Sequence, residues 1–584
     1  MGTRQSSKFG VAAAALCCLI AVGSRGETVP PQYDVLITHG TIYDGTGAAP
    51  FAGDVAITGD RIVYVGPHAD GTAKRTIDAQ GKAVAPGFIN MLSWANESLL
   101  VDGRGQSDLR QGVTLEVMGE GDSMGPLTPK MKQLAEKRQI DIHYQIDWTT
   151  LGQYLEKLEK QGISPNVTSF VGATTVRVHE LGEENVAPTP AQLARMQGLV
   201  KQAMEEGAVG VGSSLIYSPA TYAKTPELIA LMRAAAACGG MYISHMRNEG
   251  NHVLEAVDEL IEISTQSGAP AEIYHMKVAG KPNWDKLSPM IAKIDAARAA
   301  GNRITANMYT YQAGATGLDA AMPPWVQEGG LEKWIARLKD PAVRKRVIAE
   351  MRDPHTKWDN LYALAGPQGT LMLQFKNPEL KPLTGHSLAE IAAMLHVSPE
   401  DAAIRLVVKD GSRVGVAYFL MSEDNIKREI ALPYVSFGSD EAAQAPEGVF
   451  LKSNSHPRAY GNVARLLGRY VRDEKVIPLQ DAIRKLSSQP ASNLSLHDRG
   501  MLKVGNYADV VVFDPATVQD HATFKKPQVF ATGVSEVFVN GVEALKDGAP
   551  TGAHSGRFVR GRAWTGWPDG GCRKSSADWT WAKN

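Results

Sequence analysis

The chain has 584 residues, of which 43% are hydrophobic and 21% charged, and its formal net charge is −1. This composition is typical of a globular protein, and the length is sufficient for one large domain and a smaller one. The near-neutral charge argues against a surface for nucleic acid or anionic membranes, because both need an excess of basic residues.

The N-terminus has the pattern of a secretory signal. Basic residues precede a short apolar run at 11–22, and small residues follow it. The run is too short to cross a bilayer, and no other stretch could serve as a transmembrane segment. Residues 1–26 are therefore predicted to be a cleavable signal peptide, and the protein to be periplasmic or secreted. A lipoprotein signal at Cys17 or Cys18 is the alternative, but the residues before them make a poor small-residue motif.

Residues 33–86 alternate short β-type runs with turns that contain Gly and Asp. The period of two predicts an antiparallel β unit. The same pattern returns near the other end of the chain, in "ADVVVFDP" and "VSEVFVNGVEAL". We therefore expect residues 33–86 plus 500–562 to form one small β-sandwich domain.

Residues 87–499 repeat a capped helix, a glycine and a short apolar strand, roughly every 30 residues where the repeat is clearest. This pattern is typical of βα crossovers and a parallel sheet, and the number of units favours an α/β fold with a TIM-like (β/α)8 barrel. An open doubly wound sheet is the alternative, but no G-x-G-x-x-G follows the first strand. The repeat of helices and strands is interrupted between 320 and 430, which predicts an inserted subdomain over the barrel mouth.

Two of the four cysteines lie beyond the predicted signal. Cys238 falls in an alanine-rich helix, where a small buried thiol is expected. An oxidising compartment permits a disulfide with Cys572, but two cysteines do not define a disulfide framework, so their pairing stays open.

Barrel enzymes carry their reacting groups at the carboxyl ends of strands. Two consecutive predicted strands end in His245 and His275, an earlier one in Glu120 and a later one in Asp440. Two imidazoles and a carboxylate suit Zn²⁺ with an open fourth position, and such an ion polarises carbonyls and activates water. An uncoordinated Asp440 could then shuttle protons.

Each candidate also has a plainer interpretation. A single histidine at a strand end is more often structural, although two on consecutive strands favour a ligand pair. Asp440 could equally cap the next helix. Glu120 and Asp122 could each be a solvated loop carboxylate. Arg458, close behind Asp440, could make a surface ion pair, or together with His456 it could bind a substrate carboxylate.

Longer motifs run nearly from end to end, among them "YDVLITHGTIYDGTG", "APGFIN", "YISHMRNEG", "MYTYQAGATGL", "GSDEA", "HPRAYG" and "TGAHSGRFVRG". In these motifs the chain resembles the N-acyl-D-amino-acid deacylase (D-aminoacylase) branch of the amidohydrolase superfamily. The resemblance implies a TIM-like barrel beside a small β-sandwich. It also implies zinc-dependent release of a D-amino acid from an N-acyl-D-amino acid, a small-molecule substrate that bears a carboxylate.

The resemblance implies roles for individual residues as well. His245 and His275 match the family's zinc-ligating histidines, and Asp440 matches its general acid/base. Arg458 matches the residue that contacts the α-carboxylate of the substrate. Tyr309 matches a residue that helps to polarise the scissile carbonyl.

Two departures from the family bear on the metal. Residues 92–94 are Leu-Ser-Trp where the family has His-x-His, so a second metal position has lost its ligands. The family's cysteine ligand falls at "MGEGD" in this chain. A one-residue deletion aligns Glu120 with it, whereas a gapless alignment puts Gly121 there, which cannot ligate. Because a carboxylate is a good zinc ligand, we expect Glu120 and the two histidines to hold one Zn²⁺.

Other functions fit the same residues. A dipeptide, lactam or lactone could replace the N-acyl-D-amino acid, because only the resemblance sets the chirality and acyl group. The competing class is a secreted, non-catalytic binding protein that kept the barrel and lost the metal. The presence of His245, His275 and Asp440 argues against that class.

Overall fold

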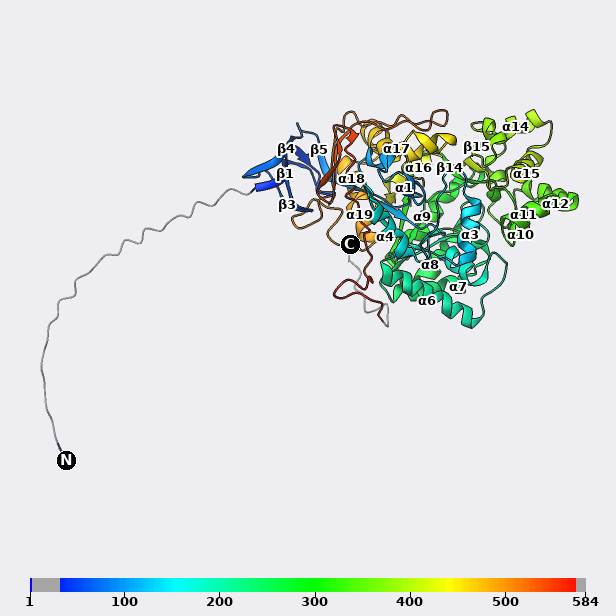
Figure 1. The fold of residues 1–584 in the computed structure, drawn as a ribbon, viewed down its shortest axis with the longest axis horizontal. Helices are drawn as coiled ribbons and strands as arrows, with labels where there is room; N and C mark the ends of the chain where they lie inside the picture. Colours follow the sequence, from blue (N-terminus) through cyan, green and yellow to red (C-terminus); the bar gives the residue numbers. More distant parts are fainter. Residues whose placement is uncertain (3–31, 574–584) are drawn as a thin grey trace.

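The computed structural model describes residues 1–2 and 32–573, so nearly all of the predicted signal peptide, including its basic and apolar residues, lies outside the described residues. In Figure 1 the first strands, drawn in blue, lie beside the last part of the chain, drawn in red-brown. The helices of the interrupted region, drawn in green, lie at the opposite end of the molecule. The parallel strands lie between these two ends.

Both ends of the chain contribute to one nine-stranded sheet of order β21-β20-β19-β18-β5-β1-β2-β3, in which β4 also pairs with β1. Its strands are β1 (Gln32–Ile42), β2 (Phe51–Thr58), β3 (Arg61–Gly66), β4 (Thr72–Asp78), β5 (Ala83–Pro86), β18 (Val510–Phe513), β19 (Val534–Val539), β20 (Val542–Lys546) and β21 (Ala549–Pro550). Strand β5 joins the two halves, because it pairs with β1 on one side and with β18 on the other.

The prediction of a purely antiparallel unit is wrong at β1. This strand pairs antiparallel with β2 but runs parallel to both β4 and β5. The period of two in the sequence fixes which side chains face the core, and it does not set the direction of the neighbouring strand. Alternate residues such as Val35 and Ile37 lie in the core of this sheet, with Val55 and Ile57 from β2.

The parallel strands lie in two sheets, β6-β7-β8 and β9-β10-β11-β12-β13-β17. Their bounds are β6 (Phe88–Asn90), β7 (Val113–Met118), β8 (Asn166–Ser169), β9 (Val171–Gly172), β10 (Gly210–Ser214), β11 (Met241–His245), β12 (Ala271–Ile273), β13 (Ile304–Met308) and β17 (Val435–Phe437). Only Phe170 separates β8 from β9. At the other edges, the Met91 N–H donates to the Phe437 carbonyl at 3.1 Å. Both sheets are consistent with a TIM-like barrel.

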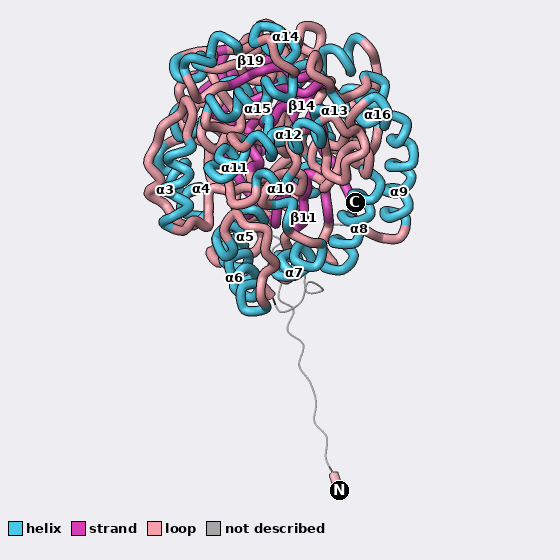
Figure 2. Tube along the Cα trace, turned by 90° about the vertical axis from the view of Figure 1, so that its right-hand side faces the viewer, coloured by secondary structure: helices cyan, strands magenta, loops and turns pink. Residues whose placement is uncertain are grey.

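Helices cover these strands on the outside, as Figure 2 shows for α5 (Ala173–Leu181), α6 (Pro190–Glu206), α7 (Thr225–Ala236), α8 (Val253–Ser267) and α9 (Leu287–Ala299). Local signals set their ends. Thr189 and Gln192 form a capping box at the start of α6, and Gly207 takes a left-handed conformation at its end. With helices outside and packed side chains inside, all five residues of β11 are buried.

Between β13 and β17 the chain leaves the parallel sheet, in the region predicted as an insertion. It forms a three-stranded antiparallel sheet of β14 (Ala313–Gly317), β16 (Gly415–Phe419) and β15 (Thr370–Gln374). Helices α10 (Pro324–Gln327) to α15 (Pro399–Asp410) pack beside it. The departure begins at β14, a few residues before the predicted boundary at 320.

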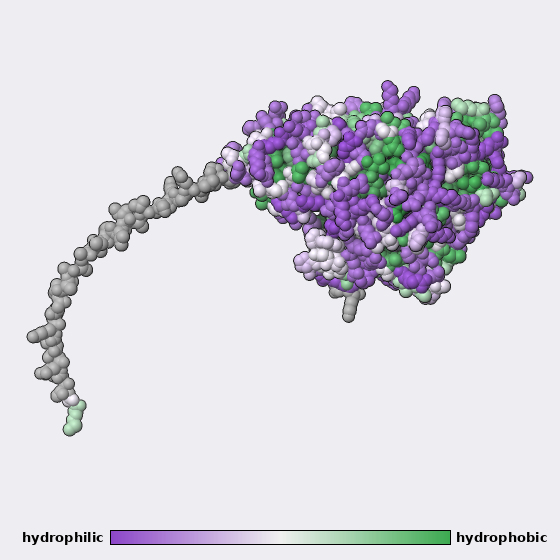
Figure 3. All heavy atoms as spheres, in the orientation of Figure 1, coloured by the Kyte–Doolittle hydropathy of each residue, from purple (hydrophilic) through white to green (hydrophobic). Residues whose placement is uncertain are grey.

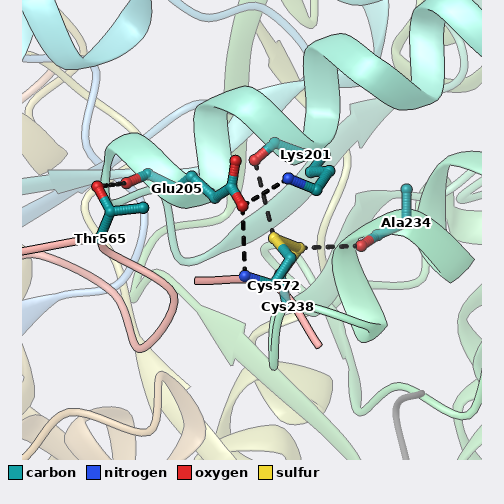
Figure 4. Close-up of a disulfide and its surroundings, with 6 residues drawn as sticks. All are labelled: Lys201, Glu205, Ala234, Cys238, Thr565 and Cys572. Atoms are coloured by element: carbon teal, nitrogen blue, oxygen red, sulfur yellow. Dashed lines mark hydrogen bonds and ion pairs between the residues drawn. A yellow bond between two sulfur atoms is a disulfide. The ribbon is translucent and has the colours of Figure 1, made fainter. Parts of the chain in front are cut away.

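The C-terminal segment differs from the expected boundary of the β domain at 562. Beyond β21 it runs along the parallel strands, where Val167 exchanges backbone hydrogen bonds with Arg557 and Val559. Farther on, Cys572 forms a disulfide with Cys238, just after α7 (Figure 4). The expected free thiol at Cys238 is therefore wrong; the partner is 334 residues away in sequence and could not be identified from spacing.

No helix in residues 1–2 and 32–573 is long and apolar enough to cross a membrane. On the face drawn in Figure 3, hydrophilic residues predominate and hydrophobic ones are interspersed among them.

Candidate active site

The three predicted metal ligands converge at the carboxyl ends of the parallel strands. Glu120 follows β7, His245 ends β11 and His275 follows β12, and all three are at most 5% exposed. Glu120 Oε1 lies 2.9 Å from His275 Nε2 and 3.3 Å from His245 Nδ1. One ligand atom from each residue lies within 4.8 Å of the others. A carboxylate and two imidazoles in this arrangement fit Zn²⁺ with an open position.

The turn around Glu120 explains how its carboxylate reaches the histidines. Gly119 and Gly121 both have positive φ angles, 102° and 71°. A Cβ atom at Gly121 would lie 2.5 Å from Ser214 Oγ, and one at Gly119 would lie 2.3 Å from the Phe170 carbonyl oxygen. Only glycine fits at either position, so the Gly-Glu-Gly sequence presents Glu120 alone to the cluster.

Glu249 contacts the far side of both imidazoles, a role that the sequence analysis missed. Its Oε1 lies 3.1 Å from His275 Nδ1 and its Oε2 lies 3.5 Å from His245 Nε2. A carboxylate in this position fixes which ring nitrogen faces a metal. Burial alone would raise the pKa of Glu249, but the charges of His245, Lys277 and His275 lower it well below its usual value. The sequence signal that could have identified Glu249 is the polar cluster "HMRNE" at the end of a strand.

Lys277 contacts the same cluster without replacing Glu120 as its third member. Its Nζ donates to Glu249 Oε1 at 2.6 Å and lies 2.7 Å from His275 Nδ1. Burial and the charge of Lys277 lower the pKa of His275, but the carboxylates of Glu249 and Glu120 outweigh them and raise it to about 9. The cluster thus places two carboxylates against two imidazoles and one ammonium group.

Asp440 follows β17 and faces the cluster across the indole of Trp94. The Trp94 Nε1 donates to Asp440 Oδ1 at 3.1 Å and to Glu120 Oε2 at 3.0 Å. Asp440 caps no helix, because the next helical turn starts at Gly448. Burial raises the pKa of Asp440, although the Arg458 charge lowers it. Its φ of 53° is a left-handed conformation that costs energy in a residue other than glycine and is common at functional sites.

Arg458 begins α17 (Arg458–Arg465) and is 1% exposed. One guanidinium nitrogen, Nη2, donates to Asp440 Oδ2 at 2.8 Å and to the Asp440 carbonyl at 2.6 Å. The group lies over the ring of Tyr309, 4.3 Å from its centre. Its Nε and Nη1 are buried without a hydrogen-bond partner among the described residues.

His456 does not occupy the substrate-binding position expected from the sequence. Its Nε2 lies 2.9 Å from the Ala313 carbonyl oxygen, and its Nδ1 accepts the Arg458 backbone N–H at 3.0 Å. Both ring nitrogens are therefore used, and the side chain is fully buried. His456 lies near Arg458 in sequence because its ring accepts the backbone N–H of Arg458 at the start of α17.

A cavity of about 700 Å³ connects the cluster to the surface. Asp440, Tyr309, Lys277 and Trp94 line its inner end. Asp122, two residues after Glu120, lies on the cavity wall outside the cluster. The outer wall is largely apolar and includes Leu127, Met131, Leu134, Leu331, Trp334 and Leu373.

Two helices border the outer part of this cavity, α3 (Pro129–Arg138) and α11 (Leu331–Leu338). Arg138 at the end of α3 donates to Glu183 at 2.8 Å and to Glu332 of α11 at 2.9 Å. These ion pairs connect the parallel-strand region with the inserted region at the cavity.

Comparisons with known proteins identify the family of this chain. The model of the Amidohydrolase family matches residues 75–544. D-aminoacylase of Alcaligenes xylosoxydans xylosoxydans is 32% identical over 92% of this chain and 99% of its own length. N-acyl-D-glutamate deacylase of the same organism is 31% identical over 91% of this chain and 97% of its own.

Solved structures extend the likeness to the fold. A D-aminoacylase studied for its binuclear metal centre, with one-metal activation and second-metal attenuation, matches with a TM-score of 0.74 and 32% identity. The alignment covers 90% of this chain and all of that one. The N-acyl-D-glutamate deacylase of Bordetella bronchiseptica, solved with zinc and a phosphonate inhibitor, matches with a TM-score of 0.74 and 29% identity over 91% of this chain and all of that one. The chain therefore belongs to the amidohydrolase family, in the branch of the D-aminoacylases and N-acyl-D-amino-acid deacylases, and is a metal-dependent hydrolase of amide C–N bonds.

Proposed function

We propose that this protein is a zinc-dependent deacylase that releases a D-amino acid from an N-acyl-D-amino acid. The observation that carries the proposal is the buried cluster of Glu120, His245 and His275, which opens on a cavity beside Asp440. A Zn²⁺ ion held by these three residues would polarise the scissile carbonyl and activate water. Three protein ligands with one open position suit a single catalytic ion, and this supports a centre with one Zn²⁺.

Asp440 is the proposed general acid/base. It accepts the proton of the attacking water and delivers it to the leaving nitrogen, which is a poor leaving group until it is protonated. Its raised pKa favours such exchange, because burial makes the ionised carboxylate a better base. Hydrogen bonds from Trp94 and Arg458 on opposite oxygens orient the carboxylate.

Arg458, Tyr309 and Lys277 are the proposed contacts of the substrate. Arg458 has two donor nitrogens without a partner, Nε and Nη1, and its guanidinium charge would attract a substrate carboxylate. Tyr309 lies between Arg458 and Lys277, with its ring within 5.8 Å of both cationic groups. A substrate carboxylate at Arg458 would leave the adjoining amide near Tyr309 and the metal cluster.

We also propose that the protein is exported. Its N-terminal sequence has the features of a signal peptide, and the disulfide between Cys238 and Cys572 is a bond that persists in oxidising compartments. Mass spectrometry of the native protein tests this point. An intact Met1 would contradict export through a cleaved signal.

The function is tested by measuring metal content and turnover on the same preparation. We expect about one zinc per chain and hydrolysis of N-acyl-D-amino acids in preference to their L-enantiomers. Short peptides, a lactam and a lactone belong in the same assay, because faster turnover of any of them would change the substrate class. A metal-free protein that binds N-acyl amino acids without turnover would favour the non-catalytic alternative.

A further inference from the structure

We propose that the Trp94 indole occupies the place of a second metal ion, so that the centre accepts one ion only. The inference rests on the proposed function as a hydrolase with one zinc ion, and it concerns the side chain that excludes a second ion. Its basis is one N–H group shared by two carboxylates, at 3.0 Å from Glu120 Oε2 and 3.1 Å from Asp440 Oδ1.

The two carboxylates need a positive group between them. Glu120 belongs to the ligand cluster and Asp440 carries protons, and each charge raises the energy of the other in this buried site. In a binuclear centre a cation can fill such a position, and the matching D-aminoacylase structure concerns a binuclear centre in which the second metal attenuates activity. The indole N–H supplies a donor there, but it has no lone pair with which to bind a cation.

The backbone holds the indole in place from both sides. The Ser93 N–H donates to the Val117 carbonyl of β7 at 2.8 Å, and the Trp94 N–H donates to the Glu441 carbonyl at 2.9 Å. In return, the Leu92 carbonyl accepts the Asp440 N–H at 2.8 Å. These bonds tie the backbone at Trp94 to the two strand ends that carry Glu120 and Asp440, and the indole lines the cavity between the two carboxylates.

The neighbours of Trp94 offer no ligand in its place. Leu92 is apolar and fully buried. The Ser93 Oγ accepts the Ala95 backbone N–H at 3.2 Å. In the part of the chain that the structure describes, the cluster of Glu120, His245 and His275 is the one group of three candidate ligands.

Two consequences follow for the reaction. Excess zinc should leave turnover unchanged, because no second ion enters. The indole is also a positioning residue, since it orients the proton-carrying Asp440 against the ligand Glu120. Without its N–H, the two carboxylates repel each other and Asp440 leaves its productive orientation.

The test compares the wild type with Trp94→Phe, Trp94→His and the control Trp567→Phe, an exposed tryptophan of the C-terminal segment. Each protein is dialysed against excess zinc, and zinc per chain is measured by mass spectrometry without substrate. We expect one equivalent for the wild type, Trp94→Phe and the control. Trp94→His should bind two, because the new imidazole joins two carboxylates as a ligand.

Kinetics give the second readout. Trp94→Phe keeps the ring but lacks the donor, so kcat should fall by about 10-fold or more while KM changes little. Trp94→His should lose activity progressively as zinc is raised, and the wild type should not. Two zinc equivalents in the wild type, one in Trp94→His, or an unchanged kcat in Trp94→Phe would each overturn the proposal. An inactive wild type with one zinc would instead refute the proposed substrate class and leave this inference standing.

Discussion

Asp440 is held by donors from two sides, with Trp94 on one oxygen and Arg458 on the other. We expect Asp440→Asn to keep its zinc, because Glu120 and the two histidines supply the ligands. The amide cannot carry the proton, so kcat should fall by about 10² to 10⁴. Metal analysis and kinetics on the same sample check this. Loss of the zinc would mean that Asp440 is a ligand.

The two unpartnered donors of Arg458 predict its contribution to substrate binding. Arg458→Lys keeps a positive charge beside Asp440 but removes the Nε and Nη1 donors. We expect kcat/KM to fall about 10-fold more for an N-acyl-D-amino acid than for its amide, which lacks the carboxylate. Equal losses on the two substrates would show that Arg458 acts only through Asp440.

The sequence was sufficient to name some of these residues and insufficient for others. His245, His275 and Asp440 end or follow short apolar strands, so position made them candidates, and the family resemblance assigned their roles. The structure distinguishes Glu120 from its neighbours, because a side chain at Gly121 would clash with Ser214 and Asp122 lies outside the ligand cluster. The contacts of Trp94 could not be predicted, since they depend on how two strands distant in sequence pair at its backbone.

At the scale of elements, two carboxylates are buried together where β6, β7 and α2 (Gln106–Leu109) meet. Asn90 of β6 donates to Glu116 Oε2 at 3.0 Å and to Asp108 Oδ2 at 3.4 Å. Burial raises the pKa of Glu116 to about 7, although hydrogen bonds from Ser93, Asp108 and Asn90 lower it. The folded protein therefore retains a proton that the unfolded chain releases at lower pH.

This proton makes stability depend on pH with a definite sign. As pH rises from about 4.5 to about 7, the unfolded chain ionises Glu116 first, so the free energy of unfolding falls. Glu116→Gln should therefore gain stability relative to the wild type on going from pH 5 to pH 8, by up to about 3 kcal/mol. Urea unfolding at both values checks this, with the exposed Glu262→Gln as control. A difference independent of pH would contradict the prediction.

The elements themselves were predictable where a pattern repeats. The alternation of helices and apolar strands identified the parallel strands, because both faces of such a sheet are covered. The start of the insertion at β14 was missed, since its "AGATG" has no strand-like pattern. The direction of β1 relative to β4 and β5 depends on connections that local periodicity does not encode.

At the scale of the whole molecule, the disulfide ties the C-terminal segment to the end of α7. Cys572→Ser should lower the free energy of unfolding by about 2–4 kcal/mol, because the cross-link restricts the unfolded chain. Urea unfolding with and without a reducing agent measures this. The reductant should lower the free energy of unfolding of the wild type to that of Cys572→Ser, and it should leave the variant unchanged. Equal stability of the wild type and the variant without reductant would contradict this role of the disulfide.

The nine-stranded sheet has a consequence for how the protein reaches its native state. Strand β5 needs β18 as its neighbour, and more than 420 residues separate them in the sequence. During synthesis or translocation the first strands therefore emerge long before the edge that completes them. Closing such a distant pair is slow, so the chain stays incompletely folded until its final strands are available. Slow folding would keep the chain unfolded while it passes through a membrane pore. A chain that is not exported would instead expose unpaired strand edges, which promotes aggregation.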